Sequence, residues 1–201
     1  MFLLGTHPDW QERLRQEVLR ECGGDTAALS DGDALNKLKL LYKHDLADGD
    51  DELAINTAGD VVLYETLRLY GPVSMISRMA TADADLGGVR VPKGTVTTIP
   101  IAILHRDEDV WGADAGEFNP LRFRDGVNRA VAHAGALLAF SLGPRSCIGQ
   151  DFAILEMKTT LAMILRRFSF EVSPEYVHAP MDLLTLQPQC GLPVVVKLLD
   201  Q

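Results

Sequence analysis

The ten residues from Phe140 to Gly149, FSLGPRSCIG, combine side chains that could bind a metal with backbone that could approach a flat ligand. Cys147 lies just before a predicted helix, whose free N–H groups and positive dipole end would stabilise a thiolate. Gly143 and Gly149 would let the backbone approach a flat macrocycle closely. Arg145 suits a carboxylate, and Phe140 could shield the sulfur from water, which tunes an iron's potential. Each residue type would therefore have a use if Cys147 bound the iron of a haem.

Two interpretations of Cys147 stay open on the residues alone. A single cysteine before a helix is more often a small buried residue than a ligand. Five fixed identities at set offsets, however, arise by chance in a chain of this length at a rate on the order of one in ten thousand or less. The alternative to a haem site is a globular binding module that contains the motif by chance and retains no haem.

The elements that must position this segment are predicted from apolar periodicity and turn residues. Helices are predicted over residues 9–21, 61–70 and 149–167, with a further helical pattern over 36–40. Asp60 could cap the helix that Gly71-Pro72 would end. The buried stripe of the last helix is predicted to be Ile154, Met157, Leu161, Ile164, Leu165 and Phe168. A hairpin is predicted over 86–99, a last strand over 192–199, and loops over 41–60 and 105–136.

The composition excludes several classes of protein. The 201 residues carry a net charge of −9, which argues against general nucleic-acid binding because that function needs a basic face. The three cysteines, Cys22, Cys147 and Cys190, are odd in number and show no CxxC spacing. A disulfide framework or structural zinc site is therefore not expected, and Cys22 and Cys190 are interpreted as bystanders. The apolar start, Met1 to Leu4, is too short for a signal core or a membrane span.

The segment FSLGPRSCIG resembles the haem-binding signature of the cytochrome P450 family, on Phe140, Gly143, Arg145, Cys147 and Gly149. Other pieces are similar to the family and follow in its order: ETLR at 65–68, HRD at 105–107, VWG at 110–112 and EFNPLRF at 117–123. The resemblance covers nearly the whole chain except residues 41–60. Within the family, the sequence most resembles the plant microsomal members. It implies a fold that is mainly α with a small β-sheet (α+β), with residues 1–201 forming the C-terminal part of the cytochrome P450 domain.

The resemblance implies a role for each matching position. Cys147 would be the axial iron ligand, with Arg145 and Arg78 as partners of the haem propionates. A buried charge network behind the haem would be formed by Glu65, Arg68 and Arg122. The substrate pocket would be lined by Val73, Ser74, Met75, Ile76, Leu184 and Thr185. Each role has an alternative without a function in binding. The charge network could be a surface ion pair, Arg78 could be an ordinary exposed arginine, and the pocket residues could belong to the hydrophobic core.

Two further Glu-x-x-Arg spacings show that this short pattern is weak by itself. Glu12 and Arg15, and Glu17 and Arg20, have the same spacing on the first predicted helix. They are interpreted as surface pairs, which contribute about 0.2–0.5 kcal/mol each. Only position relative to Cys147 selects residues 65 and 68.

The resemblance also implies an activity. Members are haem-thiolate monooxygenases, which oxidise a hydrophobic organic substrate with one atom of molecular oxygen. The electrons would come from a reductase partner that uses NADPH. The implied location is the cytosolic face of the endoplasmic reticulum membrane, through the N-terminal anchor of the family, and no nucleic-acid partner is expected.

The sequence departs from the family in two places. The oxygen-activating helix of the family carries Ala-Gly-x-x-Thr, and after the three Ala-Gly pairs of this chain the threonine position is held by Val62, Asn119 and Leu138. That helix and the anchor are therefore expected to be absent, and the alternative function is a catalytically inactive fragment or splice product with only the proximal haem-binding half. Residues 41–60 are interpreted as an atypical insertion, with a retained intron or gene-model artefact as the hypothesis.

Overall fold

The computed structural model describes residues 1–22, 61–131, 133 and 135–199. The helical pattern predicted over 36–40, the capping residue Asp60 and the proposed insertion over 41–60 lie outside the described residues. Within the described part, no helix combines the length and apolar character that crossing a bilayer requires.

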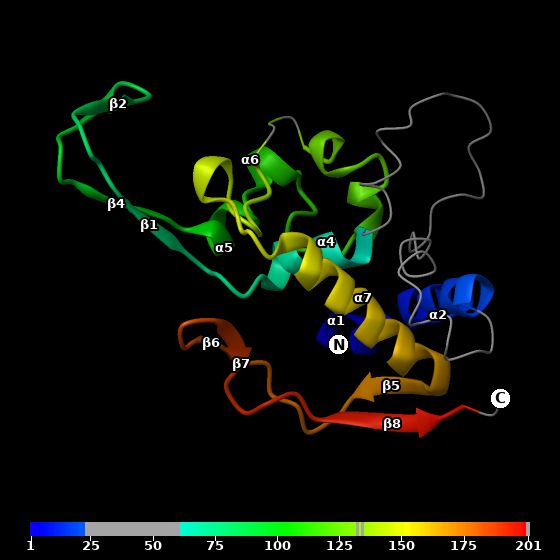
Figure 1. Ribbon diagram of the computed structural model, residues 1–201. Helices are drawn as coiled ribbons and strands as arrows, with labels where there is room; N and C mark the ends of the chain where they lie inside the picture. Colours follow the sequence, from blue (N-terminus) through cyan, green and yellow to red (C-terminus); the bar gives the residue numbers. More distant parts are fainter. Residues whose placement is uncertain (23–60, 132, 134, 200–201) are drawn as a thin grey trace, which may run out of the picture.

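Four helices form the framework of the fold: α1 (Phe2–Thr6), α2 (Pro8–Cys22), α4 (Val61–Tyr70) and α7 (Gln150–Arg167). The predicted helices over 9–21, 61–70 and 149–167 are confirmed as α2, α4 and α7. Helix α7 packs against α2, and Figure 1 shows it crossing in front of α4. Helix α1, whose Leu3 and Leu4 are buried, was not predicted.

The hydrophobic core lies where α4 meets the segments after it and the inner face of α7. Its fully buried members include Leu14 of α2, Val61 and Val62 of α4, Phe123, and Leu165 of α7. The predicted stripe of α7 is confirmed at its centre, since Ile154 and Leu165 are buried and Met157, Leu161 and Ile164 pack against the core. Phe168 instead begins a strand, because α7 ends at Arg167.

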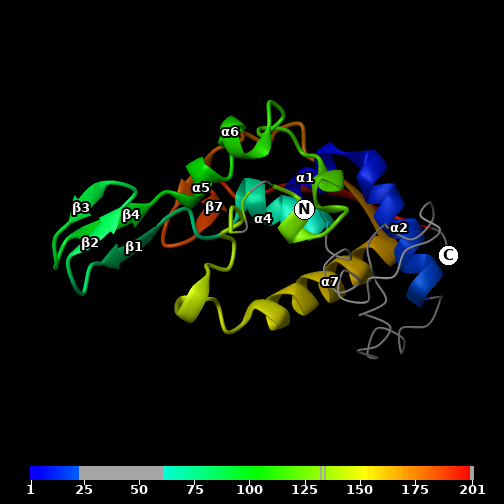
Figure 2. The ribbon, with the colours of Figure 1, turned by 90° about the horizontal axis from the view of Figure 1, so that it is seen from above.

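The middle of the chain forms an arm of two antiparallel pairs, which projects from the helices (Figures 1 and 2). Strand β1 (Ile76–Met79) pairs with β4 (Val96–Ile99), and β2 (Ala84–Leu86) pairs with β3 (Val89–Val91). The prediction of one hairpin over 86–99 was therefore wrong in its pairing. The physical reason is the turn after Pro92, where Gly94 has a φ of +86° and the ladder between the two pairs is interrupted.

Short helices occupy the stretch that was predicted as loop over 105–136. Helix α5 (Ile101–Leu104) precedes it, and α6 (Glu108–Trp111) lies inside it, capped by Asp107, whose carboxylate accepts the Asp109 N–H at 3.0 Å. Two 3₁₀ turns follow, η3 (Pro120–Phe123) and η4 (Val127–Arg129), and η3 packs against α4.

The end of the chain adds two more antiparallel pairs. Strand β5 (Phe168–Val172) pairs with β8 (Val194–Leu198), and β6 (Pro180–Asp182) pairs with β7 (Leu186–Pro188). The predicted last strand is confirmed as β8, whereas β5, β6 and β7 were not predicted.

The arginine of the first predicted surface pair is buried. Arg15 is 6% exposed, and its Nη1 donates to the carbonyl oxygens of Leu165 at 2.7 Å and Phe168 at 3.0 Å. These carbonyls end α7, where the helix leaves them without partners of its own. Glu17 is also buried, at 2% exposed. The surface interpretation was therefore wrong for one residue of each pair, since the partners Glu12 and Arg20 are exposed.

Candidate functional site

A tight loop holds Cys147 in front of α7. The loop contains the 3₁₀ turn η5 (Gly143–Arg145), and Gly143 begins it with a φ of +70°, which favours glycine. The Cys147 N–H donates to the Phe140 carbonyl at 2.8 Å, which closes the loop on itself. Cys147 is a free, exposed thiol three residues before the first residue of α7.

The surroundings of Cys147 fit an iron macrocycle that carries carboxylates. A Cβ at Gly143 would meet open space, and a Cβ at Gly149 would stand 4.0 Å from the Cys147 sulfur, so nothing in the loop covers that face. Arg145 is exposed beside the cysteine. Arg78 reaches the same loop from β1, since its Nη2 donates to Ser141 Oγ at 3.3 Å. The structure therefore brings an exposed thiol and two exposed guanidinium groups to one loop.

Besides its carbonyl, which anchors Cys147, Phe140 also contributes its side chain to the packing of the loop. It is half-buried and packs against the hydrophobic core. The core therefore fixes the residue whose carbonyl anchors Cys147. That its ring shields the sulfur from water stays a prediction.

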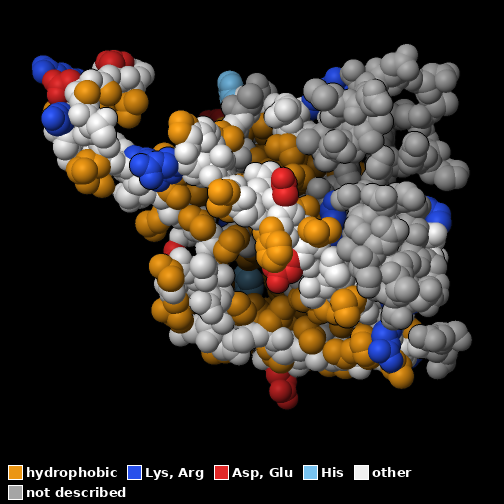
Figure 3. All heavy atoms as spheres, in the orientation of Figure 1, with side chains coloured by type: hydrophobic (Ala, Val, Ile, Leu, Met, Phe, Trp, Pro, Cys, Tyr) orange, Lys and Arg blue, Asp and Glu red, His pale blue; other side chains and the backbone are white. Residues whose placement is uncertain are grey.

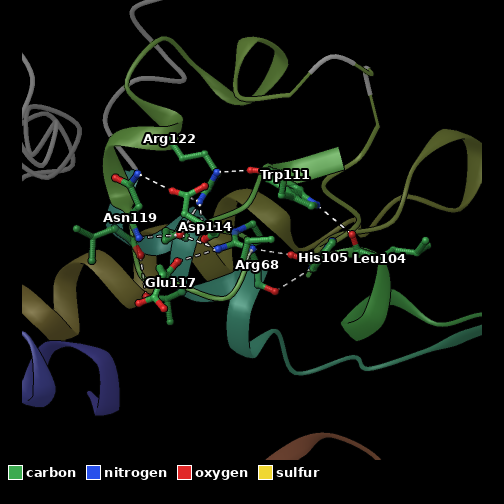
Figure 4. A network of polar contacts seen from close by, with 12 residues as sticks. Arg68, Leu104, His105, Trp111, Asp114, Glu117, Asn119 and Arg122 are labelled. Carbon is green, nitrogen blue, oxygen red and sulfur yellow. Dashed lines mark hydrogen bonds and ion pairs between the residues drawn. The ribbon is translucent and has the colours of Figure 1, made fainter. Parts of the chain in front are cut away.

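Glu65 and Arg68 form a buried ion pair on α4 (Figure 4). They are 0% and 1% exposed, and Arg68 Nε and Nη2 donate to the two carboxylate oxygens of Glu65 at 2.7 and 2.8 Å. The remaining N–H groups of Arg68 donate to the carbonyls of His105 and Ala115, both at 2.6 Å, and of Glu117 at 3.1 Å. All five guanidinium donors are thus satisfied, and the alternative of a surface ion pair is excluded.

Arg122 closes onto the same pair from η3. Its Nε lies 3.7 Å from Glu65 Oε1, and its Nη1 donates to the Trp111 carbonyl at 2.6 Å. Its Nη2 lies 2.9 Å from a carboxylate oxygen of Asp114. A hydrogen bond from the Asn119 side chain, together with Arg122, holds the pKa of Asp114 below its ordinary value. The three residues that the sequence singled out are therefore one connected network.

His105 was not predicted as a site residue, although it begins the HRD segment at 105–107 that resembles the family. It is 1% exposed, and both ring nitrogens have partners: Nδ1 lies 3.1 Å from the Arg68 carbonyl, and the Leu138 N–H donates to Nε2 at 2.8 Å. The carbonyl needs a donor and the amide needs an acceptor, so the proton sits on Nδ1. Burial, together with the smaller effect of the charges of Arg68 and Arg106, lowers the pKa of His105 to about 4, although the hydrogen bond to the Arg68 carbonyl acts in the opposite direction. The ring is therefore neutral at pH 7.

The predicted pocket residues lie on the outside of the described structure. Val73, Met75 and Leu184 are 39%, 57% and 95% exposed, so plain core is the wrong interpretation for them. Ser74 and Ile76 are half-buried, and Thr185 is exposed. The two segments are neighbours, because the Ser74 hydroxyl donates to Asp182 and the Leu186 N–H donates to the Pro72 carbonyl at 2.7 Å.

Apolar side chains are also exposed on the face that α7 shares with the cysteine loop, and Figure 3 shows hydrophobic atoms gathered on that side of the molecule. Ile148 is fully exposed, and on α7 Phe152 and Met163 are 71% and 57% exposed. The site therefore adjoins an apolar surface, which suits a largely apolar ligand.

Comparisons with known proteins identify the class of protein that this fold and site define. The family model "Cytochrome P450" matches residues 59–192. The chain is 46% identical over 199 residues to cytochrome P450 709B1 of Arabidopsis thaliana, a match that covers 98% of this chain and 34% of that protein. It is 44% identical over 198 residues to secologanin synthase 1 of Catharanthus roseus, with coverage of 98% and 34%.

A solved structure shows the same fold. The retinoic acid bound cyanobacterial CYP120A1 aligns with a TM-score of 0.78 and 28% identity, over 98% of this chain and 40% of that chain. The chain belongs to the cytochrome P450 family, and the predicted mainly helical fold with a small β content is confirmed. It spans about a third of the length of the curated relatives that it matches.

Proposed function

We propose that this chain forms the proximal half of a haem-thiolate monooxygenase site, with Cys147 as the axial ligand of the iron. The observation that carries the proposal is the exposed Cys147 thiol in a loop that the Phe140 carbonyl closes at 2.8 Å, directly before α7. The helix N-terminus would stabilise the thiolate form that binds iron.

The residues around Cys147 would hold the cofactor. Arg145 and Arg78 would pair with its carboxylates, and Gly143 and Gly149 leave its approach open. When bound, the haem supplies the iron chemistry by which one atom of molecular oxygen enters an organic substrate. The chain's own contribution is a fixed thiolate, two cationic partners and an apolar surface beside them.

The network of Glu65, Arg68 and Arg122 would act behind the haem as a structural support. It ties α4 to the segments that carry Ala115, Glu117 and Trp111. Its charges are paired inside the fold, so its role would be to hold geometry rather than to react.

The proposed substrate is a small hydrophobic organic molecule. Residues 73–76 and the neighbouring turn at 184–185 would line its pocket, because they present Val73, Met75 and Leu184 to the outside. Electrons would come from a reductase that uses NADPH, and the location would be the cytosolic face of the endoplasmic reticulum membrane, as in plant microsomal members of the family.

A second candidate is that these 201 residues bind haem on one face without turning over substrate. One observation favours it: no Ala-Gly-x-x-Thr occurs in these 201 residues, since Val62, Asn119 and Leu138 stand at the threonine position after the three Ala-Gly pairs. The two candidates share the Cys147 ligand and differ in oxygen activation.

One experiment tests the haem site and separates the candidates. Residues 1–201 are expressed, supplied with haemin, reduced and exposed to carbon monoxide, and the difference spectrum is recorded. The red-shifted Soret band of a thiolate ligand is expected, and Cys147→Ser should lose it. Cys190→Ser is the matched control, because Cys190 is also free and exposed.

The outcomes are distinct. A thiolate band with oxidation of a hydrophobic substrate supports the monooxygenase, and a thiolate band without oxidation supports the one-face fragment. Haem-free protein that is indifferent to Cys147→Ser would mean a binding module with a chance motif, and the proposal would be wrong.

A further inference from the structure

The ring of His105 joins two parts of the chain that are far apart in sequence. On one side, Nδ1 donates to the Arg68 carbonyl at the end of α4, over 3.1 Å. On the other side, Nε2 accepts the Leu138 N–H at 2.8 Å. A second hydrogen bond joins His105 to Arg68, because the Arg68 guanidinium donates to the His105 carbonyl at 2.6 Å. His105 is therefore held twice by Arg68 (Figure 4), and its remaining nitrogen accepts from Leu138.

The contact at Leu138 continues directly into the cysteine loop. The Ser141 N–H donates to the Leu138 carbonyl at 3.0 Å, so Leu138 closes a turn over Phe140. The Phe140 carbonyl in turn accepts the Cys147 N–H at 2.8 Å. The Ser141 hydroxyl accepts a hydrogen bond from Arg78 at 3.3 Å. A displacement of Leu138 would thus move both the anchor of Cys147 and the contact of Arg78.

We propose that His105 is a positioning residue of the haem site, and that its ring transmits the geometry of the Glu65–Arg68 pair to the loop that holds Cys147. The inference rests on the proposed haem-thiolate function. It assigns to His105 a role that neither the charge network nor the cysteine motif contains, because the ring contacts Leu138 rather than any residue proposed to bind haem.

Histidine meets the requirements of this place better than its substitutes. The side chain at position 105 needs one hydrogen-bond donor and one acceptor on a rigid, neutral ring. That ring must also pack edge-on against Trp111, whose ring centre lies 6.1 Å away with an angle of 79° between the ring planes. The charged groups nearest to it, Arg68 and Arg106, disfavour a second ring proton. Phenylalanine would fill the volume with neither polar atom, and glutamine would keep a donor and an acceptor on a flexible chain.

The first test needs no cofactor. Amide hydrogen exchange is measured at Leu138 and Cys147 in the haem-free 201-residue chain and in its His105→Phe and His105→Gln variants. We expect exchange at both amides to be about tenfold faster in His105→Phe, since one hydrogen bond is lost, and within about threefold of wild type in His105→Gln. The amides of β5 and β8 should not change.

Thr66→Val is the matched control. It also removes one side-chain hydrogen bond to backbone, from Thr66 Oγ1 to the Val62 carbonyl at 2.7 Å, but this bond does not lead to Leu138. If Thr66→Val accelerates exchange at Leu138 and Cys147 as much as His105→Phe does, or if neither variant accelerates it, the proposal is overturned.

A second measurement keeps the test decisive if His105→Phe does not fold. In the ¹⁵N-labelled wild-type chain, the N–H···N hydrogen bond should give a direct nitrogen–nitrogen coupling between Leu138 N and His105 Nε2. Absence of that coupling in the folded chain would refute the contact on which the inference depends.

The haem readout separates this inference from the proposed function. Haemin titration should show affinity about tenfold lower in His105→Phe, with a smaller thiolate fraction in the Soret band and recovery in His105→Gln. If wild type shows no thiolate band, the proposed function fails, and amide exchange still decides whether His105 positions the loop. If wild type shows it and His105→Phe leaves both affinity and spectrum unchanged, the function stands and this inference fails.

Discussion

Replacing Arg68 with lysine tests whether the buried pair depends on the shape of its donors or only on charge. The guanidinium donates to both carboxylate oxygens of Glu65 and to three backbone carbonyls, at 2.6 to 3.1 Å. A lysine ammonium has three donors on one atom, so at least two of these five acceptors lose their partner. Each buried acceptor left unsatisfied costs about 1–3 kcal/mol. With charge retained beside Glu65, we expect a loss of about 2–4 kcal/mol in the free energy of unfolding.

Urea unfolding followed by circular dichroism and by tryptophan fluorescence measures this loss. Trp111 reports on the site, because the Arg68 guanidinium lies 5.1 Å from its ring centre. Arg90→Lys is the matched control, since Arg90 pairs with Asp83 at 3.2 Å with both side chains exposed, and it should change stability by less than about 0.5 kcal/mol. An Arg68→Lys variant as stable as the Arg90→Lys control would refute the reasoning.

Three further predictions concern other parts of the fold. His105 is protonated below about pH 6.5 in the unfolded chain but only near pH 4 in the folded chain, so lowering the pH across this window should lower the free energy of unfolding by about 3 kcal/mol. Urea titrations at several pH values should show this pH dependence, and the His105→Gln variant should lack it. Arg15→Leu should destabilise the chain by about 2–4 kcal/mol in the same assay, because two carbonyls at the end of α7 lose a donor. Gly71→Ala should lower the thermal midpoint by several degrees, since its Cβ would stand 2.5 Å from the Leu67 carbonyl oxygen and cost about 1–3 kcal/mol; Gly116→Ala, whose Cβ meets open space, should not.

The parts of the fold that the sequence predicted well are those governed by local patterns. Helix α7 repeats apolar residues at helical spacing, and α4 ends at Tyr70 because Gly71-Pro72 follows it. The cysteine motif is likewise local, since its identities stand at fixed offsets within ten residues. Local order of this kind is visible without knowledge of any partner element.

The parts that were missed depend on contacts between distant residues. Arg15 has the spacing of a surface pair with Glu12, and its burial is decided by Leu165 and Phe168, which lie 150 and 153 residues away. The pairing of β1 with β4 also required knowing that the turn at Pro92 separates β3 from β4. No periodicity encodes such choices, because each depends on which surfaces meet after the chain folds.

The candidate site has two parts, the charge network and the cysteine loop, and they differ in how many of their polar and charged groups have partners within the chain. Glu65, Arg68, Arg122 and Asp114 carry two negative and two positive charges, so the network is neutral, and every donor of Arg68 has an acceptor within the fold. The buried Arg122 Nε has no hydrogen-bond partner, so the pairing of charges, and not complete hydrogen bonding, offsets the burial of this network. The loop in front of it is the opposite case, with the Cys147 thiol exposed. The sequence thus builds a charge-paired support and leaves the ligand face open. Among the described residues, His105 is the buried side chain that hydrogen-bonds both Arg68 and Leu138, and it connects the two.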